Sequence, residues 1–202
     1  MSHYFKDDPT LPNDYKTFDY YLGDKKFTFT SNSGVFSPGH VDPATDLLLR
    51  NMPPLQGSLL DLGCGYGVIC IVLAGLYGLE VTMADVNPRA LACAERNCAI
   101  NNVNARIIES DGFAQIPGMF ESITLNPPIH AGKEVVYAMF EQAAKHLAPG
   151  GAFYAVMLDK HGAASAKRRL EEIFGACETL YRKKGYSVWK CCKSGDCSPG
   201  TI

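Results

Sequence analysis

From residue 58 onwards, two kinds of hydrophobic pattern alternate along the chain. Short apolar runs predict strands at 58–62, 80–84, 105–109, 122–125 and 152–158. Longer apolar or helically spaced segments predict helices at 68–77, after Asn87-Pro88, at 133–147 and at 163–174. Because strands and helices alternate, we expect an open, mostly parallel sheet with helices on both of its faces.

The first 50 residues follow a different pattern. Aromatic and threonine-rich runs at 17–21 and 26–30, separated by a glycine-containing turn, predict a β-hairpin. A glycine- and proline-containing loop at 33–40 follows the hairpin. Asp42 and Pro43 then have the residue types of an N-cap and a first helical position, so a short helix is expected to begin here.

The C-terminal part returns to antiparallel pairing. Pro149-Gly150-Gly151 predicts a turn before the strand at 152–158. Two further runs, 178–183 and 186–190, are joined through Gly185 and predict a closing antiparallel pair. We therefore expect a seven-stranded sheet that is mostly parallel and ends in an antiparallel strand.

Length and pattern together predict one domain with two appendages. The 202 residues are enough to bury a full core. Residues 1–40 are expected to form an extension and hairpin that pack on the domain, and residues 41–191 the domain itself. The polar segment 192–202 is expected to be a disordered tail.

Composition narrows the possible partners and the compartment. With 19 basic and 21 acidic residues, the whole chain has no nucleic-acid signature, so any RNA contact requires a local patch. We find no signal peptide and no long apolar span, so a cytoplasmic protein without membrane contact is expected. The eight cysteines form no CxxC pair, which favours reduced structural thiols over a metal site.

The candidate chemistry begins at a glycine turn. Leu59–Leu62 ends a predicted strand, and Gly63, Gly65 and Gly67 then alternate with other residues before an apolar helix. Glycine allows a ligand to approach bare backbone, and the helix N-terminus directs unpaired N–H groups toward the turn. This arrangement predicts a site for a nucleotide-like cofactor.

Acidic residues follow the next two predicted strands. Asp85 ends the second strand and has the residue type that accepts both ribose hydroxyls, although it is also a possible N-cap. Asp111 follows the third strand and can accept from an adenine amino group, with Phe113 or Ile108 over the ring. A solvated turn aspartate is the alternative interpretation of Asp111.

Asp61 decides between two classes of cofactor. Dehydrogenases bind NAD at a similar glycine-rich turn, so the turn alone does not distinguish NAD from S-adenosylmethionine. However, a carboxylate two residues before Gly63 is unfavourable beside a pyrophosphate and favourable beside an amino group. Asp61 therefore favours S-adenosylmethionine over NAD.

The loop after the fourth strand, Asn126-Pro127-Pro128, indicates which reaction the site could perform. The prolines stiffen the loop and donate no backbone hydrogen bonds, which leaves the Asn126 and Pro127 carbonyls as acceptors. Two acceptors on one exocyclic NH₂ hold both protons and direct the nitrogen lone pair toward a methyl group. The sulfonium is already electrophilic, so no metal is required, and positioning is the main contribution. A stiff turn without function is the alternative.

These motifs resemble those of the class I S-adenosylmethionine-dependent methyltransferases, which have a Rossmann-like fold. The resemblance covers about residues 15–190 and rests on 61–67, 85–87, 111–113, 126–128 with Gly132-Lys133, and Lys184-Gly185-Tyr186. The chain is most similar to the small-subunit methyltransferase domain family, which includes 16S ribosomal RNA guanine-N2 methyltransferases. Gly34-Val35-Phe36-Ser37 contributes to this narrower resemblance.

The resemblance implies roles for individual residues. The implied catalytic residues are Asn126, Pro127 and Pro128. The implied cofactor-binding residues are Asp61, Gly63, Cys64, Gly65, Gly67, Asp85, Val86, Asn87, Asp111, Gly112, Phe113 and Asn126. The implied acceptor-binding residues are Phe36, Ile129, His130 and Lys133, with the Gly34–Ser37 loop as a lid.

Two departures from the resembled family concern the acceptor. Ile129 stands where members with a guanine substrate tend to have an aromatic residue. Those members also have an additional N-terminal half, so this chain corresponds to the catalytic half alone. His130 is a candidate proton acceptor or an incidental loop residue. The basic clusters 167–169 and 182–184 are candidate phosphate contacts or ordinary solvated surface.

The leading hypothesis is methyl transfer to an exocyclic amine in RNA, with guanine N2 of small-subunit ribosomal RNA as acceptor. The expected partner is ribosomal RNA or a small-subunit particle, and the chain is expected to be a monomer or homodimer. Protein glutamine and DNA adenine are alternative acceptors for the same loop. A non-catalytic RNA-binding module and an NAD-dependent oxidoreductase are further alternatives.

Overall fold

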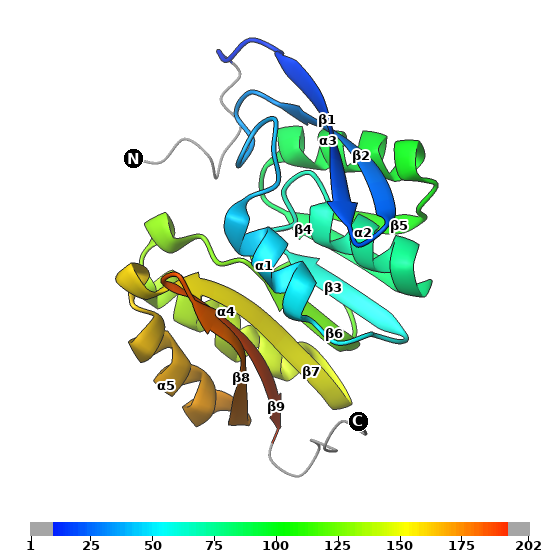
Figure 1. The fold of residues 1–202 in the computed structure, drawn as a ribbon. Helices are drawn as coiled ribbons and strands as arrows, with labels where there is room; N and C mark the ends of the chain where they lie inside the picture. Colours follow the sequence, from blue (N-terminus) through cyan, green and yellow to red (C-terminus); the bar gives the residue numbers. More distant parts are fainter. Residues whose placement is uncertain (1–9, 194–202) are drawn as a thin grey trace.

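The computed structural model describes residues 10–193 and contains two sheets and flanking helices (Figure 1). The smaller sheet is the predicted hairpin, formed by β1 (Tyr15–Leu22) and β2 (Lys25–Asn32). The larger sheet has seven strands in the order β5-β4-β3-β6-β7-β9-β8. Its strands are β3 (Ser58–Leu62), β4 (Glu80–Asp85), β5 (Ala105–Glu109), β6 (Phe120–Leu125), β7 (Leu147–Leu158), β8 (Gly175–Lys183) and β9 (Tyr186–Lys193).

The predicted mostly parallel arrangement is confirmed. β3 pairs in parallel with β4 on one side and β6 on the other, and β7 is parallel to β6. The last strand, β9, lies between β7 and β8 and is antiparallel to both. The helices are α1 (Pro43–Asn51), α2 (Val68–Tyr77), α3 (Pro88–Asn101), α4 (Lys133–His146) and α5 (Ala163–Phe174). The order of strands and helices is that of the expected Rossmann-like fold.

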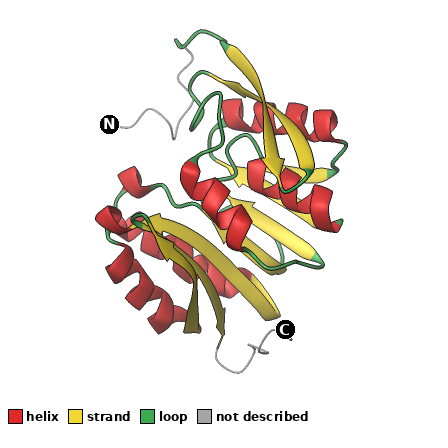
Figure 2. Ribbon diagram, in the orientation of Figure 1, coloured by secondary structure: helices red, strands yellow, loops and turns green. Residues whose placement is uncertain are grey.

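Helices cover both faces of the large sheet, as Figure 2 shows. Along β7, side chains alternate between two buried clusters because successive residues of a strand point to opposite faces. Tyr154 and Val156 join the cluster that contains α1, α2 and α3 residues, whereas Phe153 and Ala155 join the one that contains α4 and α5 residues. Two buried layers therefore hold the sheet rigidly between the helices.

Two asparagines of α3 attach the hairpin to the domain. The Asn97 side chain accepts from Thr30 N (2.7 Å) and donates to Thr30 O (2.9 Å) and Tyr66 O (2.8 Å). One helical turn later, Asn101 accepts from Thr28 N (3.0 Å) and donates to Thr28 O (2.8 Å). The two side chains therefore continue the hydrogen bonding of β2 as a neighbouring strand would.

Two sequence-based boundaries are wrong in detail. Residues 149–151 do not precede β7 as a separate turn, because β7 begins at Leu147 and its pairing with β6 jumps from Leu147 to Ala152. The expected tail began at residue 192, but β9 runs to Lys193 and Cys192 is buried. The rest of that segment, and the first nine residues, lie outside the described part. None of the helices within residues 10–193 is long and apolar enough to cross a membrane.

We expect Asn97→Ala to lower the free energy of unfolding by about 3 kcal/mol, because buried backbone groups of Thr30 and Tyr66 lose their partners. Urea denaturation followed by circular dichroism measures this. Asn101→Ala is the matched control and is expected to cost about 1 kcal/mol, since Asn101 is only half-buried. Equal losses from the two substitutions would contradict the importance of the buried pair.

Candidate functional site

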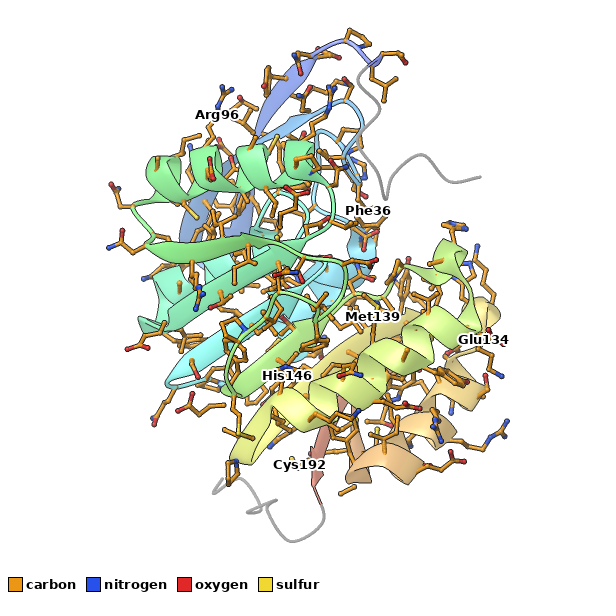
Figure 3. All side chains as sticks on the ribbon, turned by 180° about the vertical axis from the view of Figure 1, so that it is seen from behind. Phe36, Arg96, Glu134, Met139, His146 and Cys192 are labelled. Carbon is orange, nitrogen blue, oxygen red and sulfur yellow. The ribbon has the colours of Figure 1, made fainter. Side chains whose placement is uncertain are left out.

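A cavity of about 850 Å³ lies at the carboxyl ends of the central strands. Its lining includes Gly63, which directly follows β3, and Asn126, which directly follows β6. It also includes Asp85, the last residue of β4. In open parallel sheets, ligands bind at this edge, where the strand order reverses. The cavity is also bordered by the loop before α1 and by α4, from which Phe36 and Met139 come (Figure 3).

The glycine turn has the backbone conformation that the sequence predicted. Gly63 and Gly65 have φ of 71° and 55°, and a Cβ atom added at either would meet nothing within 4 Å. The N–H groups of Gly63 and Cys64 both donate to Ala84 O (2.8 and 3.0 Å), which closes the turn on β4. The two glycines therefore leave open space beside the backbone, where a ligand can approach closely.

Gly67 has a different function in the turn from Gly63 and Gly65. It is not part of the cavity lining, and a Cβ atom there would come within 3.1 Å of Met83 Sδ and 3.2 Å of Ile71 Cδ1. Its φ of 90° also excludes most other residues. The ligand contact at Gly67 stays a prediction, and in the structure this glycine allows α2 to pack closely on the sheet.

Asp61 is a buried carboxyl group with one unpartnered oxygen. Its side chain is 1% exposed, and Oδ1 accepts from Thr124 Oγ1 at 2.9 Å. Oδ2 is buried and has no hydrogen-bond partner in the described residues. Burial raises the pKa of Asp61 to about 7, and the nearby Asp85 adds to the shift. A cationic ligand group would satisfy this oxygen, so the site fits a cofactor that carries an amino group.

Asp85 is held by backbone donors from two segments. Oδ2 accepts from Gly65 N (2.8 Å), and Oδ1 accepts from Asn87 N (2.9 Å). Burial raises the pKa of Asp85, and the backbone N–H donors oppose that shift. Asn87, and not Asp85, caps α3, because its side chain accepts from Arg89 N and Ala90 N. The alternative of Asp85 as the N-cap is therefore excluded, and its carboxylate lines the cavity.

Asn126-Pro127-Pro128 continues from β6 along the cavity. Asn126 Nδ2 donates to Asp42 Oδ2 and to Thr45 Oγ1, each at 3.1 Å. The carbonyl oxygen of Pro127 accepts from Ile129 N at 2.9 Å, which uses one of its two lone pairs. The side-chain carbonyl of Asn126 and the backbone carbonyl of Pro127 can therefore each still accept a hydrogen bond.

The loop between β2 and α1 covers the side of the cavity next to the glycine turn. Tyr66 Oη donates to His40 O at 2.7 Å, and Asn87 Nδ2 donates to Gly34 O at 3.0 Å. Phe36 lines the cavity from this loop and is 51% exposed. The adjacent Ser37 has a φ of 49°, a conformation that few non-glycine residues adopt. The loop is therefore fixed at both ends while its aromatic side chain stays open to solvent.

Most of the predicted site residues meet at this one cavity. Those that line it are Phe36, Asp61, Gly63, Cys64, Gly65, Asp85, Val86, Asn87, Asp111, Gly112, Asn126, Pro127, Pro128, Ile129 and His130. Cys64 is buried, which raises the pKa of its thiol and keeps it protonated.

Phe113 and Lys133 lie outside the cavity lining, so their predicted ligand contacts stay predictions. Phe113 is buried, and its ring stacks on His146 of α4 with centroids 4.6 Å apart. Lys133 is exposed; its ammonium group lies 5.2 Å from the centre of the Tyr137 ring and borders a separate cavity of about 220 Å³. Neither residue belongs to the lining of the large cavity. Both predictions followed sequence proximity to a motif, which does not fix side-chain direction.

Sequence reasoning missed several cavity residues that come from distant segments. Asp42 and Thr45 at the start of α1, Tyr66, His161 and Tyr186 all line the cavity. His161 lies beside His130, with ring centroids 6.4 Å apart. Slight desolvation, Lys160 and His130 lower the pKa of His161. Asp42 had the local pattern of an N-cap, and Tyr66 and Tyr186 lie within the motifs 61–67 and 184–186 without having been assigned a role.

Two further expectations concerned a metal site and the basic cluster at residues 167–169. No group of three or more potential metal ligands occurs among residues 10–193. In the first basic cluster, Lys167 pairs with Glu171, and Arg169 with Glu141 and Glu172. These ion pairs agree with a solvated helix face there.

The ligand-free protein is expected to lose stability as pH rises from about 5 to 7. Between about pH 4 and pH 7 Asp61 ionises in the unfolded chain, with an ordinary pKa of 3.8, but stays protonated in the folded protein, with a pKa of about 7, so rising pH favours unfolding. The stability advantage of Asp61→Asn over the wild type should therefore grow by about 2 kcal/mol between pH 5 and pH 7.5. Urea unfolding at several pH values measures it, and a constant difference would contradict the buried, unpaired carboxyl group.

Comparison with known proteins identifies the family. The family model named Methyltransferase small domain matches residues 26–190. The Bacillus subtilis protein YbxB, described as uncharacterized, is 41% identical over 194 residues, which are 93% of this chain and 96% of that protein. Ribosomal RNA small subunit methyltransferase C of Pasteurella multocida is 40% identical over 167 residues, which are 75% of this chain. The chain aligns with only 50% of that relative.

A solved structure agrees with this family. The T. thermophilus 16S rRNA N2 G1207 methyltransferase (RsmC), in complex with AdoMet and guanosine, superposes with a TM-score of 0.79 and 31% identity. The superposition covers 92% of this chain and 52% of that one. AdoMet is S-adenosylmethionine, whose amino group suits the unpartnered oxygen of Asp61. The chain belongs to the Methyltransferase small domain family and is an S-adenosylmethionine-dependent methyltransferase.

Proposed function

We propose that this methyltransferase acts on RNA and that its acceptor atom is the exocyclic N2 of a guanine in small-subunit ribosomal RNA. The observation that carries the proposal is the orientation of Asn126. Its amide nitrogen is engaged by Asp42 and Thr45, so its carbonyl oxygen is the atom left to accept from a substrate amine. The names of the relatives, and the guanosine bound by the T. thermophilus enzyme, support this acceptor class.

The cofactor would be held by residues on the β3 and β4 side of the cavity. Asp61 Oδ2 would accept from the amino group of the methionine moiety, and Gly63 and Gly65 would allow it to lie against the backbone. The Asp85 oxygens accept from backbone N–H groups and retain the capacity to accept from a ribose hydroxyl. Asp111 lines the cavity with an exposed carboxylate that can accept from the adenine amino group. S-adenosylmethionine supplies an electrophilic methyl group on a positively charged sulfur.

The chain's contribution to the reaction is to orient the amine and stabilise its developing charge. The Asn126 and Pro127 carbonyls would accept the two N–H groups, so the nitrogen lone pair points at the methyl group. Positive charge would develop on that nitrogen as it takes the methyl group from the sulfur. Two carbonyl dipoles directed at that nitrogen stabilise this charge without reorganisation. The methylated nitrogen would then lose one proton, and His161 is a candidate acceptor within the same cavity.

The remaining part of the cavity would hold the base. Phe36 presents an aromatic ring at the opening, and Ile129 gives an apolar surface beside the catalytic loop. Ile129 cannot stack on a base as an aromatic residue does, so of these two residues Phe36 is the candidate to cover the base. An acceptor atom inside paired RNA would have to leave the stack, or be captured before the strand pairs.

We expect Asn126→Ala to lower methyl transfer at least about 100-fold while S-adenosylmethionine affinity changes less than about threefold. The substitution removes a hydrogen bond that is made to the acceptor and strengthened as its charge develops. Transfer of tritium from labelled S-adenosylmethionine into unmodified 30S particles or their RNA, and calorimetry of cofactor binding, measure the two effects.

The same assay tests the substrate. Asn104→Ala is a control, because Asn104 is exposed and does not line the cavity. Digestion of the labelled RNA should place the label in N2-methylguanosine. Label in protein glutamine or in DNA adenine instead would overturn the RNA acceptor and retain the chemistry. Equal losses of cofactor affinity and transfer in Asn126→Ala would overturn the role of Asn126.

Phe36→Ala is expected to raise the KM for RNA about tenfold with little change in cofactor affinity, because base stacking is worth about 1–3 kcal/mol. Steady-state kinetics at saturating S-adenosylmethionine measures it. Tyr21→Ala is the matched control, since Tyr21 is also about half exposed but lies on the hairpin outside the cavity lining. An unchanged KM for Phe36→Ala would contradict stacking by this residue.

A further inference from the structure

We propose that Asp42 and Thr45, at the N-terminus of α1, are positioning residues that orient and polarise the Asn126 amide for methyl transfer. The proposal rests on the function proposed above, since it concerns the same acceptor-binding loop. Asp42 and Thr45 precede Asn126 by 84 and 81 residues. Both line the same cavity as Asn126, so the N-terminus of α1 and the end of β6 meet there.

The contact between Asp42 and Asn126 allows only one orientation of the amide. Asp42 Oδ2 lies 3.1 Å from the Asn126 nitrogen. A carboxylate has no proton to donate, so the Asn126 atom facing it must be the nitrogen and not the oxygen. Thr45 Oγ1, also 3.1 Å from that nitrogen, takes its second N–H. With both N–H groups engaged, a 180° rotation of the amide would place its oxygen against the Asp42 carboxylate and lose that hydrogen bond, whereas the Thr45 hydroxyl can donate or accept.

The two acceptors are themselves fixed by the helix. Asp42 Oδ2 also accepts from Ala44 N (2.9 Å) and Thr45 N (3.1 Å), so the oxygen that caps α1 is the one that binds Asn126. Pro43 fixes the first helical position, and Thr45 is only 8% exposed. Their positions therefore depend on the backbone of α1 and not on flexible side chains.

The orientation matters for the reaction. If the amide were reversed, its NH₂ would face the NH₂ of the acceptor, and two donors cannot form a hydrogen bond. Donation to a carboxylate also draws electron density toward the amide oxygen, which makes that oxygen a stronger acceptor. Asp42 and Thr45 would therefore strengthen the hydrogen bond that Asn126 forms to the amine as it becomes positively charged.

The competing explanation is that Asp42 only caps α1. A cap contributes to stability whatever residue stands at position 126, whereas a positioning residue acts through Asn126 alone. A double-mutant cycle separates the two explanations. Asp42→Ser keeps an N-cap residue with a side chain too short to hold Asn126, and Thr45→Val removes the hydroxyl while keeping the shape.

We expect kcat for methyl transfer to fall about 10- to 100-fold in Asp42→Ser and about 5-fold in Thr45→Val, with S-adenosylmethionine affinity unchanged. Asp42→Asn retains an acceptor oxygen for Asn126 and should recover most of the activity. In the Asn126→Ala background, Asp42→Ser should change kcat less than twofold. A further fall in that background as large as in the wild type would overturn the proposal.

A second measurement needs no RNA and keeps the proposal separate from the proposed function. The Asn126 side-chain NH₂ resonances, assigned by their loss in Asn126→Ala, are observed by NMR in the ligand-free protein. We expect both protons to exchange slowly in the wild type and at least tenfold faster in Asp42→Ser. If the wild type methylates no RNA but shows this protection, the acceptor assignment fails and the positioning stands. Unprotected protons in the wild type would overturn the positioning.

Discussion

The parallel register of β3, β4 and β6 is the constraint on which the cavity depends. Leu62 of β3 pairs with Ala84 on one side and with Leu125 on the other. The residues that follow these three are Gly63, Asp85 and Asn126. Aligned parallel strands therefore bring the glycine turn, a carboxylate and the amide of the proline loop to one edge, although more than 60 residues separate the first from the last.

Burial then gives these groups their chemical character. Asp61 directly precedes Leu62 inside the sheet, so one of its oxygens has lost water without gaining a partner among residues 10–193. Such a group is costly to the folded protein and is relieved by a bound cation. Asn126 is in the opposite situation, because Asp42 and Thr45 satisfy its donors and leave its acceptor open. One side of the cavity thus attracts a cationic cofactor, and the other offers an acceptor to an amine.

Hydrogen bonds link the N-terminal part of the chain to the site. The hairpin is joined to α3 through Asn97, and Asn97 also holds the backbone of Tyr66. Tyr66 in turn holds the loop at His40, just before Asp42 caps α1. Hydrogen bonds through Asn97 and Tyr66 therefore connect the hairpin to His40, two residues before the Asp42 that orients Asn126. This explains why the N-terminal elements belong to the site although the glycine turn and the proline loop lie in the domain.

The features that depend on local sequence patterns could be predicted from the sequence. The alternation of apolar runs predicted the strands and helices, and their order predicted the parallel sheet that collects Asp61, Asp85 and Asn126. Side-chain direction was not predictable, because Phe113 adjoins Asp111 in sequence yet packs on His146. Contacts between distant segments were equally hidden: Asp42 has the signature of a helix cap, and nothing local indicates its bond to Asn126. The early start of β7 also escaped prediction, because Pro149-Gly150-Gly151 has the composition of a turn while the strand pairing resumes around it.

The central claim is that the glycine turn holds the methyl donor and that Asn126 presents a guanine amine of ribosomal RNA to it. The most direct measurement is a comparison of modified nucleosides in small-subunit ribosomal RNA from cells with and without this protein. We predict that one N2-methylguanosine disappears without the protein and returns with the wild-type chain but not with Asn126→Ala. An unchanged content of N2-methylguanosine at every position would contradict the account.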